Sequence, residues 1–201
     1  YTIAHPEKYG IVHTEATLGE YTINYMKEQL MTSEMHLNEL KQFDYNELTA
    51  DQQLIYDILM NYLESELELG KYLYYIDSLK PTTGLQAQLP ILLAEYNFYE
   101  KGDIDRYLDL LVCVKDYFED VGEFEREKSK RGLFMTDAVV DRIIEQCEAF
   151  IENPDENLLI EYFDEKINHF EGLSDSEKKE YREENRKRVL SYIIPAYEGL
   201  I

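Results

Sequence analysis

Helix start and stop signals recur along the sequence, and they constrain its fold more than any other feature. Thr49 is followed three residues later by Gln52, the spacing of a capping box in which each side chain bonds the other residue's backbone amide. Ser174 and Glu177 repeat this spacing further along the chain. The Asn-Gly and Asp-Gly turns that indicate β-hairpins do not occur in the sequence. The sequence therefore predicts an all-α chain with no substantial sheet.

Apolar periodicity, together with the positions of proline and glycine, predicts about seven helices. After an irregular lead-in over residues 1–17, they cover residues 18–43, 49–79, 89–100, 103–131, 136–150, 153–170 and 174 to the end. Pro90 and Pro154 are expected in the first turns of their helices, and Asp103 is expected as a cap. Pro195 should kink or restart the last helix. Short connections favour an irregular antiparallel bundle, and we expect a single domain over residues 1–201.

The most regular apolar pattern lies in the second predicted helix. Its members recur at steps of three and four residues and form one stripe: Leu54, Ile55, Ile58, Leu59, Tyr62 and Leu63. This spacing predicts an amphipathic helix with one apolar face.

The charge of the chain excludes several classes of partner. There are 20 Lys and Arg against 42 Asp and Glu, which gives a formal charge of −22. A surface that binds nucleic acid or an anionic membrane needs clustered cations, so both partners are unexpected. No apolar run approaches the roughly 20 residues of a membrane-spanning helix, so no such segment is expected.

One stretch of the sequence is locally cationic. Residues 178–188 hold six Lys and Arg interleaved with three glutamates. One interpretation is a solvated helix face with ion pairs four residues apart, namely Asp175–Lys179, Glu183–Lys187 and Glu184–Arg188. The other interpretation is a dock for an acidic surface elsewhere on the same protein.

The sequence predicts no catalytic, cofactor-binding or metal-ligating residue. Its four histidines, His5, His13, His36 and His169, do not open the His-Glu-x-x-His motif of helical zinc hydrolases. A His5–His13 metal site assisted by Glu15 is the weaker hypothesis. Calcium-loop, phosphate-loop and nucleophile-elbow motifs are absent. A self-contained acid/base enzyme has only the excess of carboxylates in its favour.

The two cysteines, Cys113 and Cys147, lie inside apolar helical stretches. This setting predicts two small buried side chains. A disulfide between neighbouring helices stays open, because spacing alone cannot settle it. Two cysteines without a Cys-x-x-Cys pair do not predict a zinc site.

Three groups of segments carry a resemblance to a known family. The first group consists of residues 4–11 and 17–19. The second consists of residues 84–90, 102–108, 117–118 and 131–133. The third is residues 194–200, Ile-Pro-Ala-Tyr-Glu-Gly-Leu. In their order and spacing, the sequence resembles the bacterial domain-of-unknown-function 885 family. Members of this family look like mostly helical relatives of zinc metallopeptidases, and several look secreted or lipid-anchored.

The resemblance implies a non-catalytic role for this chain. The family's His-Glu-x-x-His motif lies downstream of the Pro-Ala-Tyr segment, so the chain resembles the N-terminal helical fragment of a longer protein. Zinc would belong to the C-terminal part, which is the expected partner together with a peptide substrate. We expect the chain to form a wall or lid of the substrate cleft, where its acidic surface would favour cationic peptides. The resemblance also implies a secreted or lipid-anchored location at the cell envelope.

The alternative function is a helical interaction or scaffold domain whose parent protein has no hydrolytic activity. If the chain is a fragment, it should expose an apolar surface once covered by the missing part. We expect this surface among tyrosines and leucines near the C-terminal helix.

Overall fold

The computed structural model describes residues 6–11 and 15–201, and over those residues it contains helices and connecting segments but no strand. The α-helices are α1 (Ile23–Leu40), α2 (Ala50–Gly70), α3 (Leu85–Ala94), α4 (Lys101–Lys130), α5 (Asp137–Ile151), α6 (Leu158–His169), α7 (Asp175–Arg188) and α8 (Ile194–Leu200). Short 3-10 turns cover Pro6–Tyr9, Tyr45–Glu47, Leu73–Tyr75 and Pro154–Glu156. A π-helical turn, Val189–Ile193, joins α7 to α8 without a break. The predicted all-α fold of about seven helices is thus confirmed.

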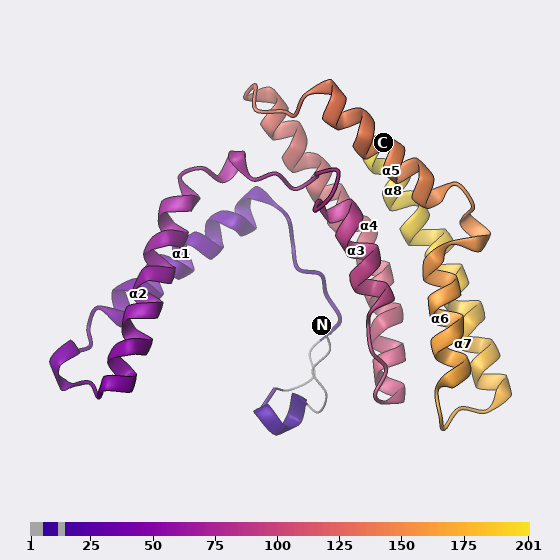
Figure 1. The fold of residues 1–201 in the computed structure, drawn as a ribbon, viewed down its shortest axis with the longest axis horizontal. Helices are drawn as coiled ribbons and strands as arrows, with labels where there is room; N and C mark the ends of the chain where they lie inside the picture. The colour runs from indigo at the N-terminus through magenta and orange to yellow at the C-terminus, as the bar shows by residue number, and fades with distance from the viewer. Residues whose placement is uncertain (1–5, 12–14) are drawn as a thin grey trace.

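The body of the molecule is built around α4. This helix packs against α7, the π-helical turn and α8, while α3 lies against α5 and α6 (Figure 1). One face of α4 is almost fully excluded from solvent, and its central residues are Ile104, Leu108, Leu111, Val114, Phe118 and Val121. These positions recur every three or four residues, as expected for a helix that is the centre of a bundle.

Helices α1 and α2 stand apart from this body. They pack on each other as an antiparallel pair, the α1–α2 hairpin, which projects from the other helices (Figure 1). Leu37 and Leu63 are buried in the hairpin, and the side chain of Leu30 approaches Gly70. The hairpin thus has a small apolar seam of its own.

The base of the hairpin is fixed to α4 by two segments, one before α1 and one after α2. The backbone N–H of Tyr21 donates to a carboxylate oxygen of Asp120 at 3.1 Å. The hydroxyl groups of Tyr21 and Ser78 share a hydrogen bond of 2.8 Å. From α4, the Lys128 ammonium donates to the carbonyl oxygen of Ile76 at 2.8 Å. These contacts place the hairpin relative to the body.

Several predicted helix ends are confirmed and others are wrong. The capping boxes of Thr49 with Gln52 and of Ser174 with Glu177 are both formed. The first helix begins only at Ile23, after Thr22 accepts a hydrogen bond from the N–H of Tyr25, rather than at residue 18. The second helix ends at Gly70 instead of residue 79.

The predicted position of Pro90 in a first helical turn is wrong. Pro90 lies inside α3, which begins at Leu85. A proline in a helix interior removes the amide that would bond the carbonyl four residues earlier, here that of Gln86. The Tyr197 hydroxyl of α8 donates to this carbonyl oxygen instead, at 2.6 Å. A contact from a distant segment thus allows the helix to include a proline.

Two other predicted helix starts are displaced by about one turn, and a third is confirmed. Asp103 is not the cap of α4 but its third residue, and its carboxylate accepts the N–H groups of Tyr99 and Glu100. Pro154 begins a 3-10 turn, and α6 follows after the Asn157 cap. Pro195 is the second residue of α8, which begins at Ile194 directly after the π-helical turn, so the predicted restart of the last helix at this proline is confirmed.

Candidate functional site

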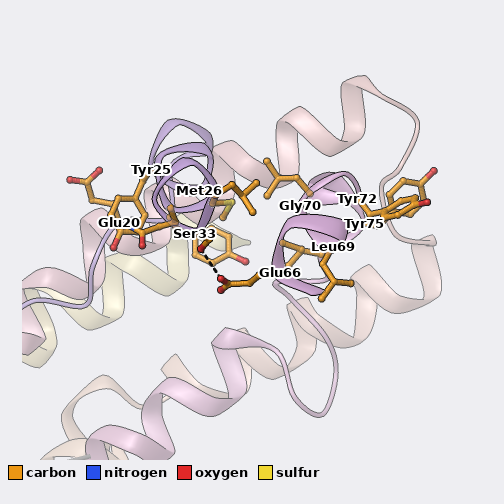
Figure 2. A pocket seen from close by; sticks show the side chains of 14 residues that line it. Glu20, Tyr25, Met26, Ser33, Glu66, Leu69, Gly70, Tyr72 and Tyr75 are labelled. Carbon is orange, nitrogen blue, oxygen red and sulfur yellow. Dashed lines mark hydrogen bonds between the residues drawn. The ribbon is translucent and has the colours of Figure 1, made fainter. Parts of the chain in front are cut away.

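A pocket of about 530 Å³ lies at the base of the α1–α2 hairpin. Its apolar walls come from α1, α2 and the turn that follows α2, and include Met26, Leu30, Leu69, Leu73 and Ile76. Four tyrosines also line it: Tyr21, Tyr25, Tyr72 and Tyr75. In Figure 2, Tyr25 lies beside α1 while Tyr72 and Tyr75 lie beyond α2. The pocket is therefore mostly apolar and partly aromatic, the usual composition of a small-molecule site.

Gly70 lets the two helices approach at this pocket. A Cβ atom on Gly70 would lie 2.6 Å from both terminal methyl groups of Leu30, closer than real carbon contacts allow. Any larger residue at this position would displace the Leu30 side chain. The glycine thus sets the width of the gap between α1 and α2.

The polar end of the pocket is a carboxylate held by two hydroxyl groups. The Ser33 hydroxyl on α1 donates to Oε2 of Glu66 on α2 at 2.7 Å, the bond drawn in Figure 2. The Tyr62 hydroxyl donates to Oε1 of the same carboxylate at 3.0 Å. Glu20 adds a second acid to the lining, which contains no Lys, Arg or His. The pocket therefore presents negative charge beside an apolar surface.

Tyr21 forms the inner boundary of the pocket and stays a hydrogen-bonding group there. Burial raises the pKa of its phenol above the ordinary value of 10.0, although the bond with Ser78 opposes this rise. The charge of nearby Glu125 raises the pKa further. Its ring packs edge-on against Tyr117 and Phe124 of α4, so the pocket is tied to the body of the protein.

Behind the pocket, a buried ion pair holds the segment that follows α2. Lys128 and Glu125 are only 2% and 5% exposed, and the ammonium lies 3.1 Å from Oε2 of Glu125. The same ammonium lies 3.7 Å from the carboxylate of Asp77. No local signal in the sequence predicts a role for Glu125 and Lys128, because they lie in the charged tail of a helix, where side chains are ordinarily solvated.

The apolar stripe of α2 is mostly exposed. Five of the six residues in the predicted stripe, together with Leu69, form what we call the α2 apolar face: Leu54, Ile55, Ile58, Leu59, Tyr62 and Leu69. Their exposed fractions run from 42% to 68%. Only Leu63 of the predicted stripe is buried, because it points toward α1. At about 100° per residue, the centre of the α2 apolar face is turned by about 110° from Leu63. The face therefore lies beside the α1 contact, and its residue Leu69 also lines the pocket.

The expected apolar surface near the C-terminal helix is wrong in its location. Ile194, Ala196 and Tyr197 of α8 are buried in the body against α4 and α5. The extensive exposed apolar surface lies on α2 instead. The hairpin displays it because, among the helices that the structure describes, α2 packs mainly against α1.

The histidines do not form a metal site in the part of the chain that the structure describes. His5 and His13 lie outside the described residues, so their hypothetical site with Glu15 stays a hypothesis. His36 is exposed on α1, and Nδ1 of His169 lies 2.8 Å from the carbonyl oxygen of Glu165. Among residues 6–11 and 15–201, no group of three or more His, Cys, Asp or Glu could hold a metal ion.

Both cysteines are free thiols. Cys147 is buried in the core, and burial raises the pKa of its thiol to about 11. Cys113 is half-buried, and its thiol lies 3.5 Å from the carbonyl oxygen of Ala16. The prediction of a small buried side chain is confirmed for Cys147 but not for Cys113, and the possible disulfide is not formed.

The cations of α7 mostly bind other parts of the same molecule. Arg188 pairs with Asp109 of α4 at 2.9 Å and with Glu184 of its own helix at 2.8 Å. Arg186 pairs with Asp155, before α6, at 2.6 Å. Of the three predicted pairs within the helix, the structure forms Glu184–Arg188, so both interpretations of this stretch describe part of what is seen.

These features define an all-helical protein region whose α1–α2 hairpin has a pocket at its base and an exposed apolar face on α2. The family model described as "Bacterial protein of unknown function (DUF885)" matches residues 6–201, and the chain belongs to this family. No curated protein matches the sequence. Within the described residues, no helix has the length and apolar character needed to cross a membrane.

A solved structure with a similar fold is described as "the putative lipoprotein from Colwellia psychrerythraea". The two share 12% sequence identity with a TM-score of 0.77, so the likeness concerns the fold. The match covers 97% of this chain and 35% of that chain. The present chain thus spans about a third of the length of this neighbour.

Proposed function

We propose that this chain is the non-catalytic helical region of a larger DUF885 protein, and that the α2 apolar face docks on the remainder of that protein. The observation that carries the proposal is the exposure of six large apolar side chains on one side of α2. Contiguous apolar surface of this kind is characteristic of interaction sites, because its transfer out of water is favourable. The length of the structural neighbour leaves room for such a partner segment.

The charge of the hairpin supports a partner with a cationic rim. Residues 23–70 contain ten acidic residues and two lysines, a formal charge of −8. Complementary charge around an apolar centre accelerates association and fixes orientation. The docked surface should therefore combine aliphatic or aromatic side chains with lysine or arginine at its edge.

The family resemblance extends the proposal to activity. It implies that the larger protein is zinc-metallopeptidase-like, with zinc held by the part outside this sequence. The hairpin would then form a wall or lid of the substrate cleft, and its acidity would favour cationic peptides by electrostatic steering. We also infer a location at the cell envelope, which the description of the structural neighbour as a lipoprotein supports.

Docking can be tested by combining residues 1–201 with the remaining polypeptide of the same reading frame. Calorimetry is expected to detect binding, which the Ile58→Asp variant should weaken at least tenfold. Ile91→Asp is a matched control, because Ile91 on α3 is 49% exposed against 58% for Ile58. Equal affinity of the two variants would contradict the proposal.

Activity requires a separate test on the full-length protein. At low salt, kcat/KM should be higher for a lysine-rich peptide than for a glutamate-rich peptide. Added salt should reduce this difference. The alternative function is a scaffold that docks a separate protein on the same α2 apolar face. Absence of chelator-sensitive hydrolysis, together with tight binding of a second protein, would favour that alternative.

A further inference from the structure

We propose that the pocket at the base of the α1–α2 hairpin binds an ammonium group carried by an apolar, preferably aromatic, body. This site belongs to residues 1–201 alone and requires neither the docked remainder nor peptide hydrolysis. The inference rests on three properties of the pocket: its size, its charge and its aromatic lining.

The size of the pocket suits one small organic ligand. Its volume of about 530 Å³ lies in the range of roughly 300–1,000 Å³ typical of ligand sites. Met26 and Leu30 on one side and Leu69 and Ile76 on the other provide apolar walls. A ligand with an aromatic or branched aliphatic body would gain from transfer out of water at this surface.

The charge of the pocket selects a cation. Each oxygen of the Glu66 carboxylate accepts one hydroxyl hydrogen bond, from Ser33 or from Tyr62. A carboxylate oxygen can accept more than one hydrogen bond, so capacity remains for an ammonium group. The bonds to the two hydroxyl groups also hold the carboxylate in place. An anionic ligand would meet Glu66 and Glu20 with no cationic side chain in the lining to offset them.

The aromatic lining supports the same selection. Tyr25, Tyr72 and Tyr75 border the pocket, and the rings of Tyr72 and Tyr75 meet edge-on at 6.1 Å between centroids. Tyrosine faces attract organic cations through the ring quadrupole. In Figure 2 these tyrosines lie at the edges of the pocket, beside α1 and beyond α2. A carboxylate and tyrosine rings that border an apolar pocket together favour hydrophobic amines.

The ammonium group has two natural sources, a free amine or the amino terminus of a peptide. Binding of three probes of one shape can establish the chemistry: phenethylammonium, phenethyl alcohol and hydrocinnamate. Methyl NMR spectra of residues 1–201 would report binding through Met26 and Leu30. We expect phenethylammonium to bind about tenfold more tightly than the alcohol, and hydrocinnamate to bind most weakly. Equal affinities, or shifts confined to other residues, would overturn the proposal.

A dipeptide amide, Phe-Leu, distinguishes the two sources. Tighter binding of the dipeptide than of phenethylammonium would assign the site to peptide amino termini, and comparable or weaker binding would assign it to free amines. Acetylation of the dipeptide amino group removes its positive charge and should therefore weaken binding of the dipeptide. Unchanged binding after acetylation would show that the pocket recognises only the apolar body, and the proposal would fail.

Three variants isolate the residues involved. Glu66→Gln should weaken phenethylammonium binding about tenfold, equivalent to about 1.4 kcal/mol, without affecting the alcohol. Glu64→Gln is the matched control on the same helix, because Glu64 does not line the pocket and pairs with Lys41 at 3.8 Å. Gly70→Ala should weaken all probes by displacing Leu30.

The inference can fail separately from the docking proposal. The α2 apolar face shares Leu69 with the pocket, but Ile58 does not line the pocket, so Ile58→Asp should leave phenethylammonium affinity unchanged. Loss of probe binding in this variant would show that the probe occupies the α2 apolar face, which contradicts the site proposed here.

Discussion

The hydroxyl of Tyr197 in α8 donates a hydrogen bond of 2.6 Å to the backbone carbonyl of Gln86 in α3. Pro90 has no amide hydrogen, so the carbonyl of Gln86 lacks its ordinary partner within the helix. Burial of the Tyr197 side chain raises the pKa of its phenol, which therefore stays protonated and able to donate. The bond joins residues 84–90 to residues 194–200, two of the segments that carry the family resemblance.

The first prediction concerns this bond. Tyr197→Phe removes the hydroxyl but keeps the ring, which packs against Phe118 and Phe150. The carbonyl of Gln86 would be left buried and unpaired, at a cost of about 1–3 kcal/mol in the free energy of unfolding. Urea denaturation followed by circular dichroism measures this change.

Pro90→Ala provides the control for the first prediction. Alanine at position 90 restores the amide that can bond the carbonyl of Gln86 within α3. Tyr197→Phe should therefore cost less in the Pro90→Ala background than in the natural sequence. An equal cost in both backgrounds would show that the hydroxyl stabilises the protein in some other way.

The second prediction concerns the buried cation at the base of the hairpin. Lys128→Met leaves the Glu125 carboxylate buried without its partner, and loss of one member of a buried ion pair costs about 3–5 kcal/mol. The variant also removes the hydrogen bond to the carbonyl of Ile76. We expect the variant to accelerate amide hydrogen exchange more in residues 23–80 than in the core of α4.

The matched variant is Lys130→Met on the same helix. Lys130 is exposed and pairs with Glu127 of the same helix, so its replacement should change stability by less than about 1 kcal/mol. If Lys128→Met and Lys130→Met had the same effect on exchange in the hairpin, the buried pair would not be what fixes the hairpin to α4.

Local signals in the sequence predicted much of this fold. The capping boxes at Thr49 and Ser174 are satisfied within four residues of chain, so they depend on nothing distant. The long central helix was also predicted within two residues at each end, because its apolar spacing matches a face that is in fact buried. The all-α fold class and the approximate positions of the helices along the chain therefore follow from short-range interactions.

Features that depend on distant segments could not be predicted. The apolar residues of α2 predict an apolar face, yet nothing in the pattern specifies whether another helix covers it. Gln86 and Tyr197 are 111 residues apart, so no local signal showed that a proline could lie inside α3. The pocket likewise depends on Ser33 and Glu66 meeting across two helices.

The third prediction concerns the reactivity of the two thiols. Cys147 is 1% exposed, and burial raises the pKa of its thiol to about 11, so almost no thiolate forms at pH 8. Cys113 is half-buried, and burial also raises the pKa of its thiol. A chromogenic disulfide reagent should therefore titrate Cys113 slowly in the folded protein and Cys147 only after unfolding in urea.

Serine variants assign the two phases of this reaction. In Cys113→Ser the folded protein should show no reactive thiol, whereas in Cys147→Ser the slow phase should persist unchanged. Simultaneous reaction of both thiols in the folded natural sequence would contradict the buried position of Cys147.

The fourth prediction concerns acid stability at the start of α7. The Lys101 ammonium lies 2.7 Å from Oε1 of Glu177, and this bond, together with those from Ser174, lowers the pKa of the Glu177 carboxyl from 4.5 to about 2. A carboxyl with a lowered pKa in the folded state stabilises the protein above its unfolded pKa. This contribution is lost as the pH falls from about 4.5 to about 2.

Carboxyl NMR titration measures the pKa of Glu177 directly. Lys101→Met should raise it toward 4.5, although the bonds from Ser174 will keep it below that value. Lys179→Met is the control, because Lys179 lies on the same helix as Glu177 but pairs with Glu183. Acid unfolding should begin at a higher pH in Lys101→Met than in Lys179→Met, because the unpaired carboxyl protonates earlier. If the two variants unfold at the same pH and leave the pKa of Glu177 unchanged, the contact between α4 and α7 does not contribute to acid stability.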